Sequence, residues 1–377
     1  MLRIGILLGD DIGLEVVPEA VMVMKAAAEK TGLEIEWQEL PIGKRGHELH
    51  GHTMPQPTVA ALEKMDGFLC GPIGHAAYPR NDPTWIMPPL RKRLDLYASI
   101  KPVKSYPNIP SVHKNVDIVF LREVTEGMQS SDTVVAGAGE FRPNDEVTIA
   151  SRVITRAGSR RVAREAFEIA CTRPRKRVTS VHKEPVYRLA CGMFAEECRK
   201  LAKEYPDVKL DEILVDGFAM KLVMTPQQFD VVVTTNQFGD ILTDEGAGVV
   251  GGLGLAPGLC VGERLAMSQA THGSAPDIAG KNIANPYALI MSGKMLLEWL
   301  GRNGVDAARF REVRDSSENR ARVAEGRRIF EAYDVRGVPA FAVDGRYLTS
   351  ARLANGVKEM MDVVEYLVGR AREERRK

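Results

Sequence analysis

The sequence predicts an α/β fold, in which strands alternate with helices and parallel strands form the sheet. The chain opens with an apolar stretch at residues 2–8, a turn with two glycines at 9–13 and an amphipathic pattern at 14–30. Strand, turn and helix in this order begin an α/β unit. A β-branched run at 229–233 is typical of a buried strand, and a helical pattern follows it from Gly239. With 377 residues the chain is long enough for two domains.

The remaining elements continue this alternation, as judged from the period of their apolar residues. Residues 90–102 are expected to form a helix followed by a strand. We expect further strands at residues 35–40, 67–70, 116–121, 147–156, 177–181 and 210–215, and helices at residues 58–65, 159–171, 193–204 and 291–300.

Composition excludes several classes of function. The 51 basic and 50 acidic residues leave a net charge of +1, so no nucleic-acid-binding surface is expected. No apolar run is long enough to cross a membrane, and the opening run is too short for the core of a signal peptide. The five cysteines contain no Cys-x-x-Cys pair, which indicates free thiols in a reducing cytoplasm.

Carboxylates in two places suggest a metal site. Asp240 and Asp244 lie four residues apart on the helix expected from Gly239, so they share one face of it. Mg²⁺ and Mn²⁺ prefer such oxygen ligands. Asp216, which follows the strand at 210–215, could be a third ligand. The alternatives are a solvated acidic helix start for the pair and a helix N-cap for Asp216.

Cationic side chains near the expected strand ends suggest an anionic substrate. Arg91, Lys101 and Arg122 could together hold two or three carboxylates. Lys183 follows the strand at 177–181, where a lysine is well placed for chemistry. Each of these residues could equally be an ordinary solvated cation.

Several long motifs together resemble the β-decarboxylating dehydrogenases, which act on isopropylmalate, isocitrate, homoisocitrate and tartrate or malate. The motifs are GDDIGLEVVPEA, LRKRLDLYASIKP, FLREVTEG, VHK, NQFGDILTDE and HGSAPDIAGKNIANP, all within about residues 1–300. The resemblance implies an isopropylmalate-dehydrogenase-like fold rather than a classical Rossmann domain. A large cofactor domain would comprise residues 1–102 and 251–309, and a smaller domain, with the dimer interface and metal ligands, residues 103–250. It also implies a homodimer whose active site is shared between subunits.

The chemistry implied by the resemblance is oxidation and decarboxylation of a 2-hydroxy acid that carries a carboxylate on C3. The cofactors would be NAD and Mg²⁺ or Mn²⁺, and Lys183, donated with Asp216 across the interface, would help to remove the hydroxyl proton. Asp216, Asp240 and Asp244 would hold the metal; Arg91, Lys101 and Arg122 would bind carboxylates; and His272, Gly273, Ser274, Ala275, Asp277 and Asn285 would bind the cofactor. Asp277 favours NAD, because a carboxylate at the adenosine ribose repels the 2′-phosphate of NADP.

Three positions depart from the family pattern. Lys101 replaces an arginine of the family, and a lysine cannot form the bidentate hydrogen bonds that an arginine makes to a carboxylate. Gln129 stands where the family has a tyrosine that donates a proton, and an amide cannot act as a general acid. Gln269 lies where the family has a glutamate before the His-Gly-Ser loop.

The segment from about residue 310 to 377 resembles the C-terminal part of a DsbA-type thioredoxin-fold protein. Val338-Pro339 is similar to its cis-proline loop, residues 341–348 to its hairpin and residues 357–370 to its last helix. The redox Cys-x-x-Cys is absent, which excludes a thioredoxin-type activity. We interpret the chain as a fusion; the alternative is a divergent tail that folds onto the large domain.

Three functions follow. The first is an NAD- and metal-dependent dehydrogenase, with isopropylmalate favoured over isocitrate and tartrate or malate because Trp85, Ile86 and Met87 could form an apolar pocket. The TEG motif favours the isocitrate and tartrate enzymes instead. The second is a catalytically silent subunit of a heteromeric isocitrate-dehydrogenase-like complex, which Lys101 and Gln129 suggest. The third is a partner-binding scaffold that carries the thioredoxin-like tail.

Overall fold

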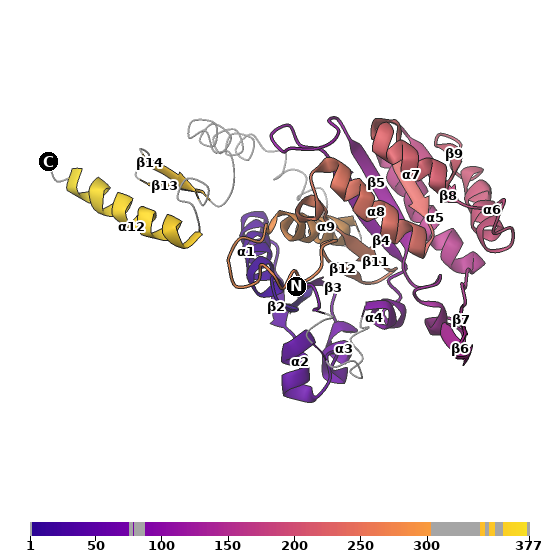
Figure 1. Cartoon of the computed structure of the whole chain (residues 1–377), viewed down its shortest axis with the longest axis horizontal. Helices are drawn as coiled ribbons and strands as arrows, with labels where there is room; N and C mark the ends of the chain where they lie inside the picture. Colours follow the sequence, from indigo (N-terminus) through magenta and orange to yellow (C-terminus); the bar gives the residue numbers. More distant parts are fainter. Residues whose placement is uncertain are drawn as a thin grey trace.

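A computed structural model describes residues 2–74, 78, 87–302, 340–343, 347–350 and 357–374. Within these ranges, ten strands form one sheet in the order β2-β1-β3-β12-β11-β4-β5-β10-β8-β9, with helices on both faces (Figure 1). No helix in these ranges is both long and apolar enough to cross a membrane. The strands are β1 (Leu2–Leu7), β2 (Ile35–Glu39), β3 (Gly67–Cys70), β4 (Ala98–Lys104), β5 (Asp117–Glu123), β8 (Arg177–His182), β9 (Lys209–Leu214), β10 (Val231–Thr234), β11 (Leu259–Val261) and β12 (Ala266–Ser268). The main helices are α1 (Gly13–Thr31), α2 (Gly43–His50), α3 (Gln56–Leu62), α4 (Met87–Arg93), α5 (Arg156–Thr172), α6 (Ala190–Ala202), α7 (Val215–Met224), α8 (Asn236–Val250) and α9 (Tyr287–Arg302).

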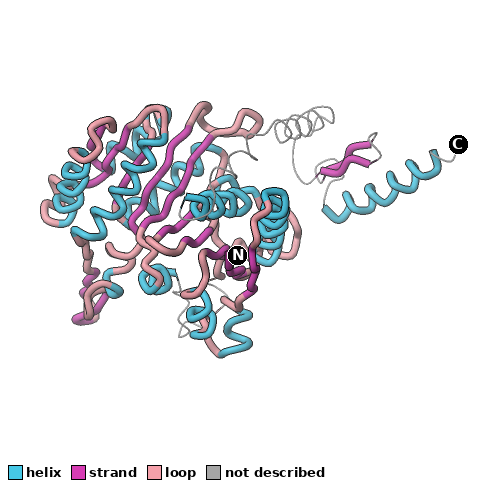
Figure 2. The backbone as a smooth tube through the Cα atoms, turned by 180° about the vertical axis from the view of Figure 1, so that it is seen from behind, coloured by secondary structure: helices cyan, strands magenta, loops and turns pink. Residues whose placement is uncertain are grey.

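The sheet consists of two parallel groups that run in opposite directions. Strands β2, β1, β3 and β12 are parallel to one another, as are β5, β10, β8 and β9. Antiparallel pairing of β12 with β11, β11 with β4 and β4 with β5 joins the groups. Strands β4 and β5, of seven residues each, lie inside the sheet where the two groups meet, and the sheet can be followed by its magenta strands in Figure 2. The carboxyl ends of the two groups consequently lie at opposite edges of the sheet.

Alternating side chains build a separate core on each face of the sheet, as the two-residue repeat of a strand requires. On β5, Val119 and Leu121 pack in the core formed with α5, α1 and α9, whereas Ile118 and Phe120 pack in the core formed with α7 and α8. All four side chains are buried. A third core, formed with α3 and α4, covers the same face as α7 and α8 but over the other strand group.

Polar side chains separate these two cores on their shared face. Along β4 the residues that face α8 change from Val103 to Lys101 and Ser99, and β5 correspondingly changes from Phe120 to Arg122. The register pairs Ser99 with Arg122 and Lys101 with Phe120. Cationic groups therefore concentrate where the two strand groups meet.

The predicted elements are largely confirmed, with two differences in extent. Within the expected strand at 147–156, only Val147–Ala150 form a strand (β7), which pairs with β6 (Glu140–Asn144) in an exposed two-stranded hairpin. Thr155 then caps α5 by accepting a hydrogen bond from the Gly158 N–H. Helix α8 begins at Asn236 rather than Gly239, which brings Asn236 into the helix.

The expected hairpin and last helix of the tail are present. Strands β13 (Ala340–Val343) and β14 (Tyr347–Ser350) pair antiparallel in a sheet of their own, and α12 (Val357–Glu374) packs against them. The Tyr347 hydroxyl donates a hydrogen bond of 2.8 Å to the Glu374 carboxylate. Val338-Pro339 lies outside the described residues.

Candidate active site

A cavity of about 280 Å³ lies over the polar region of β4 and β5. Its walls come from α4, the strands β4, β5 and β11, the loop after β5, the start of α8 and the loop after β12. The three predicted substrate-binding cations all line it, together with the predicted metal ligand Asp240 and the predicted cofactor residue His272. The full lining is Met87, Pro88, Arg91, Ser99, Lys101, Arg122, Val124, Gln129, Ser130, Asn236, Asp240, Cys260, Gln269, Ala270, Thr271 and His272.

Arg122 is the most constrained cation of the cavity. It is 7% exposed and lies at the end of β5 against α8. Its Nε and Nη2 donate to Asn236 Oδ1 at 3.1 and 2.6 Å, Nη2 also donates to Gln129 Oε1 at 2.7 Å, and Nη1 donates to Asp240 Oδ1. Four of the five guanidinium hydrogens therefore have acceptors within the protein. One hydrogen on Nη1 remains for a ligand.

Lys101 lies in the middle of β4, not at a strand end as expected. Its Nζ donates to Thr243 Oγ1 at 3.1 Å. Burial and the neighbouring Arg122 charge lower the pKa of Lys101 to about 8, although Asp244 and Asp240 partly oppose the shift. The ammonium is thus placed between the other cations and the carboxylates of α8.

The two carboxylates of α8 differ in environment. Burial opposes ionisation of Asp240, but the Arg122 charge and the Gln129 hydrogen bond outweigh burial and lower the pKa of this carboxyl. Burial raises the pKa of Asp244, and the negative charge of Asp240 adds to the effect against the opposing charge of Lys101. Two neighbouring carboxylates, one with its charge only partly compensated, fit a hard divalent cation.

Lys183 and Asp216 lie outside the cavity lining. Lys183 follows β8, and Asp216 is in the first turn of α7, so both lie at carboxyl ends of the second strand group. The Lys183 ammonium donates to Asp216 Oδ1 at 2.5 Å, and this hydrogen bond lowers the pKa of Asp216. The Asp216 side chain is 67% exposed. Within the described part of one chain, Asp216 does not form a ligand cluster with Asp240 and Asp244.

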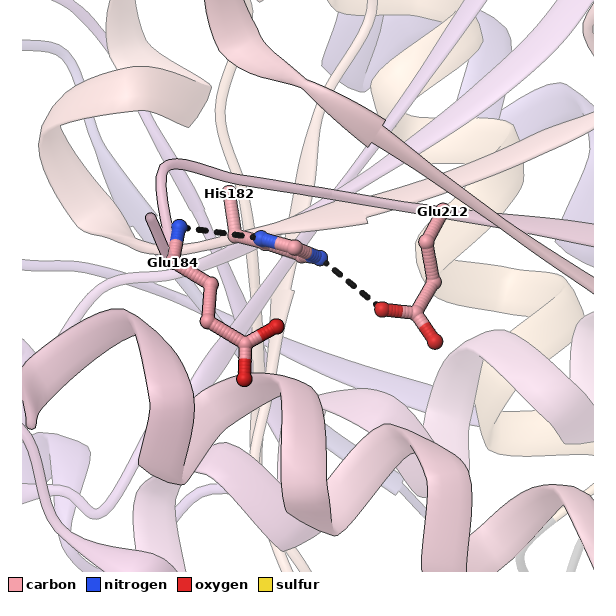
Figure 3. Close-up of side chains that lie close together, drawn as sticks. All are labelled: His182, Glu184 and Glu212. Atoms are coloured by element: carbon pink, nitrogen blue, oxygen red, sulfur yellow. Dashed lines mark hydrogen bonds and ion pairs between the residues drawn. The ribbon is translucent and has the colours of Figure 1, made fainter. Parts of the chain in front are cut away.

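Among the described residues, one group of three potential metal-binding side chains does converge: His182, Glu184 and Glu212 (Figure 3). His182 Nδ1 accepts the Glu184 backbone N–H at 3.2 Å, and Nε2 contacts Glu212 Oε2 at 3.1 Å. Arg199 already bridges the two carboxylates, with Nη2 at 2.6 Å from Glu184 and 2.7 Å from Glu212. The guanidinium therefore supplies the positive charge, and the cluster supports the turn that carries Lys183.

The predicted cofactor loop connects β12 to α9 beside the start of α1. The Ser274 carbonyl accepts the Ile12 N–H at 3.2 Å, and the Gly280 N–H donates to Glu15 Oε1 at 2.5 Å. Ala275 has a positive φ of 43°, a conformation that costs energy in a residue with a side chain. Among the predicted binders, Gly273 and Asp277 are exposed, and Asn285 Oδ1 accepts the Tyr287 N–H.

The segment expected to read the C3 substituent lies mostly outside the described residues. Trp85 and Ile86 fall there, whereas Met87 lines the cavity. Gln269 connects this region to the cations: its Oε1 accepts a hydrogen bond from Arg91 Nη2 at 3.1 Å, and its Nε2 lies 3.6 Å from the Met87 sulfur.

Sequence reasoning missed Asn236 and Ser130. Asn236 is 2% exposed and donates to the Glu126 carbonyl at 2.6 Å while it accepts from Arg122, so it ties α8 to the loop after β5. Its position within the NQFGDILTDE motif was the available signal. Four buried polar atoms of the cavity-lining residues have no hydrogen-bond partner among the described residues: Arg91 Nε, Ser130 Oγ, Thr271 Oγ1 and His272 Nε2. Buried polar atoms are normally paired, so these four indicate a polar ligand.

Two family models match the chain. The family model described as isocitrate/isopropylmalate dehydrogenase matches residues 3–318, somewhat past the expected boundary near 310, and a DSBA-like thioredoxin domain model matches residues 285–368. The two matches overlap at residues 285–318. The C-terminal match confirms the resemblance of the tail.

Curated relatives and solved structures match most of the chain. The chain is 41% identical to a 3-isopropylmalate dehydrogenase of Archaeoglobus fulgidus over 80% of this chain and 87% of that protein. It is 43% identical to an isocitrate/homoisocitrate dehydrogenase of Thermus thermophilus, over 79% and 86% of the two chains. The crystal structure of isocitrate dehydrogenase from Methylococcus capsulatus superposes with a TM-score of 0.74 at 37% identity and covers 98% of this chain and 99% of that one. The α/β fold, the motifs and these matches show that the chain belongs to the isocitrate/isopropylmalate dehydrogenase family of NAD-dependent decarboxylating dehydrogenases.

Proposed function

We propose that the protein oxidises and decarboxylates a 2-hydroxy acid with a 3-carboxylate, using NAD⁺ and Mg²⁺ or Mn²⁺. The observation that carries the proposal is the convergence of Arg91, Lys101 and Arg122 in one cavity with the carboxylate of Asp240. Three cations against one lining carboxylate favour a ligand with several negative charges. The neighbouring Asp244 adds a second hard ligand on the same helix face.

The side chains have different roles in the reaction. Arg91, Lys101 and the remaining N–H of Arg122 bind and orient the carboxylates, and Lys183, as the neutral amine rather than the ammonium, helps to remove the proton of the C2 hydroxyl, directly or through water. Asp216, Asp240 and Asp244 would hold the metal. NAD⁺ and the divalent cation would supply, when bound, hydride acceptance and polarisation of the C2 oxygen.

We propose that the site is completed in a homodimer, in which Lys183 and Asp216 of one subunit reach the cavity of the other. This proposal explains why the pair lies outside its own cavity. It is supported by exposed apolar side chains on the helices next to the pair: Met220, Val223 and Met224 on α7 and Ile241 on α8, with exposed fractions of 49–63%. Exposed apolar area of this kind is typical of a protein interface.

We propose NAD rather than NADP as the cofactor. Asp277 lies exposed in the loop after β12, where its carboxylate can accept hydrogen bonds from both ribose hydroxyls and would repel a 2′-phosphate. We also propose a cytoplasmic location, since all five cysteines are free and four of them are buried.

The described lining supports two substrate classes. Met87 and Val124 provide apolar surface for an alkyl substituent, as isopropylmalate requires. The unpaired atoms Ser130 Oγ and Thr271 Oγ1 favour instead a polar substituent, as in isocitrate or tartrate. We propose isopropylmalate as the substrate, with isocitrate as the second candidate.

The test is NADH formation by the purified protein with Mn²⁺ across isopropylmalate, isocitrate, homoisocitrate, malate and tartrate. Activity should disappear in Asp240→Asn and persist in Asp207→Asn, a control at an exposed carboxylate in the turn before β9. A folded dimer that binds NAD⁺ but oxidises none of these acids would refute the proposal and favour the silent-subunit hypothesis.

A further inference from the structure

Gln129 closes a ring of hydrogen bonds between a substrate-binding cation and a metal-binding carboxylate. Its Oε1 accepts from Arg122 Nη2 at 2.7 Å, and its Nε2 donates to Asp240 Oδ2 at 2.8 Å. Arg122 Nη1 pairs directly with Asp240 Oδ1. Arginine only donates and an ionised carboxylate only accepts, so the neighbours determine the orientation of the Gln129 amide.

The ring depends on chemistry that few side chains provide. A glutamate at position 129 could accept from Arg122 but would face Asp240 with a second negative charge. A methionine of similar length would offer neither a donor nor a strong acceptor. The carboxamide does both, through two separate atoms, and it carries no proton that titrates near neutral pH.

We propose that Gln129 is a positioning residue that couples the substrate-binding Arg122 to the metal-binding Asp240. This inference rests on the proposed function for the roles of these two neighbours. Without Gln129, Asp240 would be held only by Arg122. The two side chains could then rotate together, away from the orientation in which Asp240 binds the metal and Arg122 binds the substrate. With Gln129, each oxygen of Asp240 has its own donor, and the guanidinium is held on a third side by Asn236.

The experiment compares Gln129→Met and Gln129→Glu with the full-length wild type. One measurement is the Kd for Mn²⁺ alone, from the loss of the free-ion signal in electron paramagnetic resonance. The second is KM and kcat for isopropylmalate or isocitrate, whichever the wild type oxidises faster, and the third is Tm. Gln38→Met is the matched control, because Gln38 is exposed on the edge strand β2 far along the sheet from β5.

Gln129→Met should raise both the Kd for Mn²⁺ and KM about tenfold, since it removes one charge-assisted hydrogen bond from each partner. Gln129→Glu should separate the two constants: added negative charge should hold the Kd for Mn²⁺ at or below the wild-type value, while repulsion of the substrate carboxylate raises KM at least tenfold. A residue needed only for folding would shift both constants together with Tm. The control should leave all three measurements unchanged.

The inference is overturned if both variants keep Kd and KM within twofold of the wild type, or if the two constants change only in proportion to a loss of Tm. A wild type that binds no Mn²⁺ would also overturn it. If the wild type binds Mn²⁺ but oxidises no acid, the proposed function fails. In that case the inference is supported if Gln129→Met raises the Kd for Mn²⁺ and Gln129→Glu does not, and it is refuted by any other result.

Discussion

Replacing Gly239 by alanine should displace Arg122 while leaving the fold intact. A Cβ atom at position 239 would lie 2.7 Å from Arg122 Cγ, 2.8 Å from Cβ and 3.2 Å from Cδ. Ordinary contacts begin near 3.4 Å, so the arginine must retreat by about 0.7 Å. The guanidinium cannot follow freely, because Asn236, Gln129 and Asp240 hold it.

The expected magnitude follows from two opposing effects on stability. Alanine in a helix interior is roughly 0.5–1 kcal/mol more favourable than glycine, whereas overpacking costs roughly 1–3 kcal/mol. The net loss in the free energy of unfolding should thus stay below about 2.5 kcal/mol. A displacement approaching 1 Å at a group that binds substrate costs on the order of 100-fold, so kcat/KM should fall about 10- to 100-fold.

The assay is NADH formation together with urea unfolding of the same preparations. Gly192→Ala in α6 is the matched control, because its new methyl group would meet only Glu184 at ordinary contact distances of 3.8 and 4.0 Å. That variant should keep wild-type kcat/KM and be at least as stable as the wild type. If Gly239→Ala retained kcat/KM within threefold while folded, the position of Arg122 would not govern substrate binding, and the reasoning would be wrong.

Two further predictions concern buried polar groups beside the cavity. Asn236→Ala should lower the free energy of unfolding by about 2–3 kcal/mol, because it leaves buried Arg122 hydrogens without an acceptor, and Asn236→Asp should restore part of the loss; urea unfolding measures both. Glu126 is 4% exposed, and its pKa is raised from 4.5 to about 7 by burial and by the charge of Glu123. The folded state therefore binds this proton more tightly than the unfolded chain does. Its contribution is fully present below pH 4.5 and is lost as pH rises to about 7, by up to about 3.5 kcal/mol at about 1.4 kcal/mol per pH unit. Glu126→Gln should flatten the stability curve in this window, and parallel curves for variant and wild type would contradict the assignment.

Local patterns in the sequence were sufficient for most elements and for the residue types of the site. The β-branched run of β10 is buried, because a strand that is apolar on both faces fits inside a parallel sheet covered by helices on both sides. The four-residue spacing of Asp240 and Asp244 sets their shared helix face in the same way, since it depends on helix geometry alone. Motif resemblance added the family, which the comparisons confirm.

Only the tertiary structure could decide contacts between distant segments. Nothing local in residues 259–268 shows that β11 and β12 lie between β3 and β4 and so join two opposed strand groups. Strand β4 is one of the antiparallel strands that join the two groups. Lys101 therefore lies in the middle of a strand that borders the cavity, and not at a strand end. The exposed β7 also ends at Ala150, sooner than its alternating pattern predicted, and Thr155, within the predicted strand, caps α5 instead.

The clearest case is Gln129. From the sequence it was only a position without the family tyrosine, and its effect could be stated only as a missing proton donor. The fold brings it to Asp240, which lies 111 residues further along the chain, and to Arg122 at the end of β5. A side chain's chemistry is set by its type, but its partners are set by how the strands and helices pack, and a single sequence does not contain that packing in any local pattern.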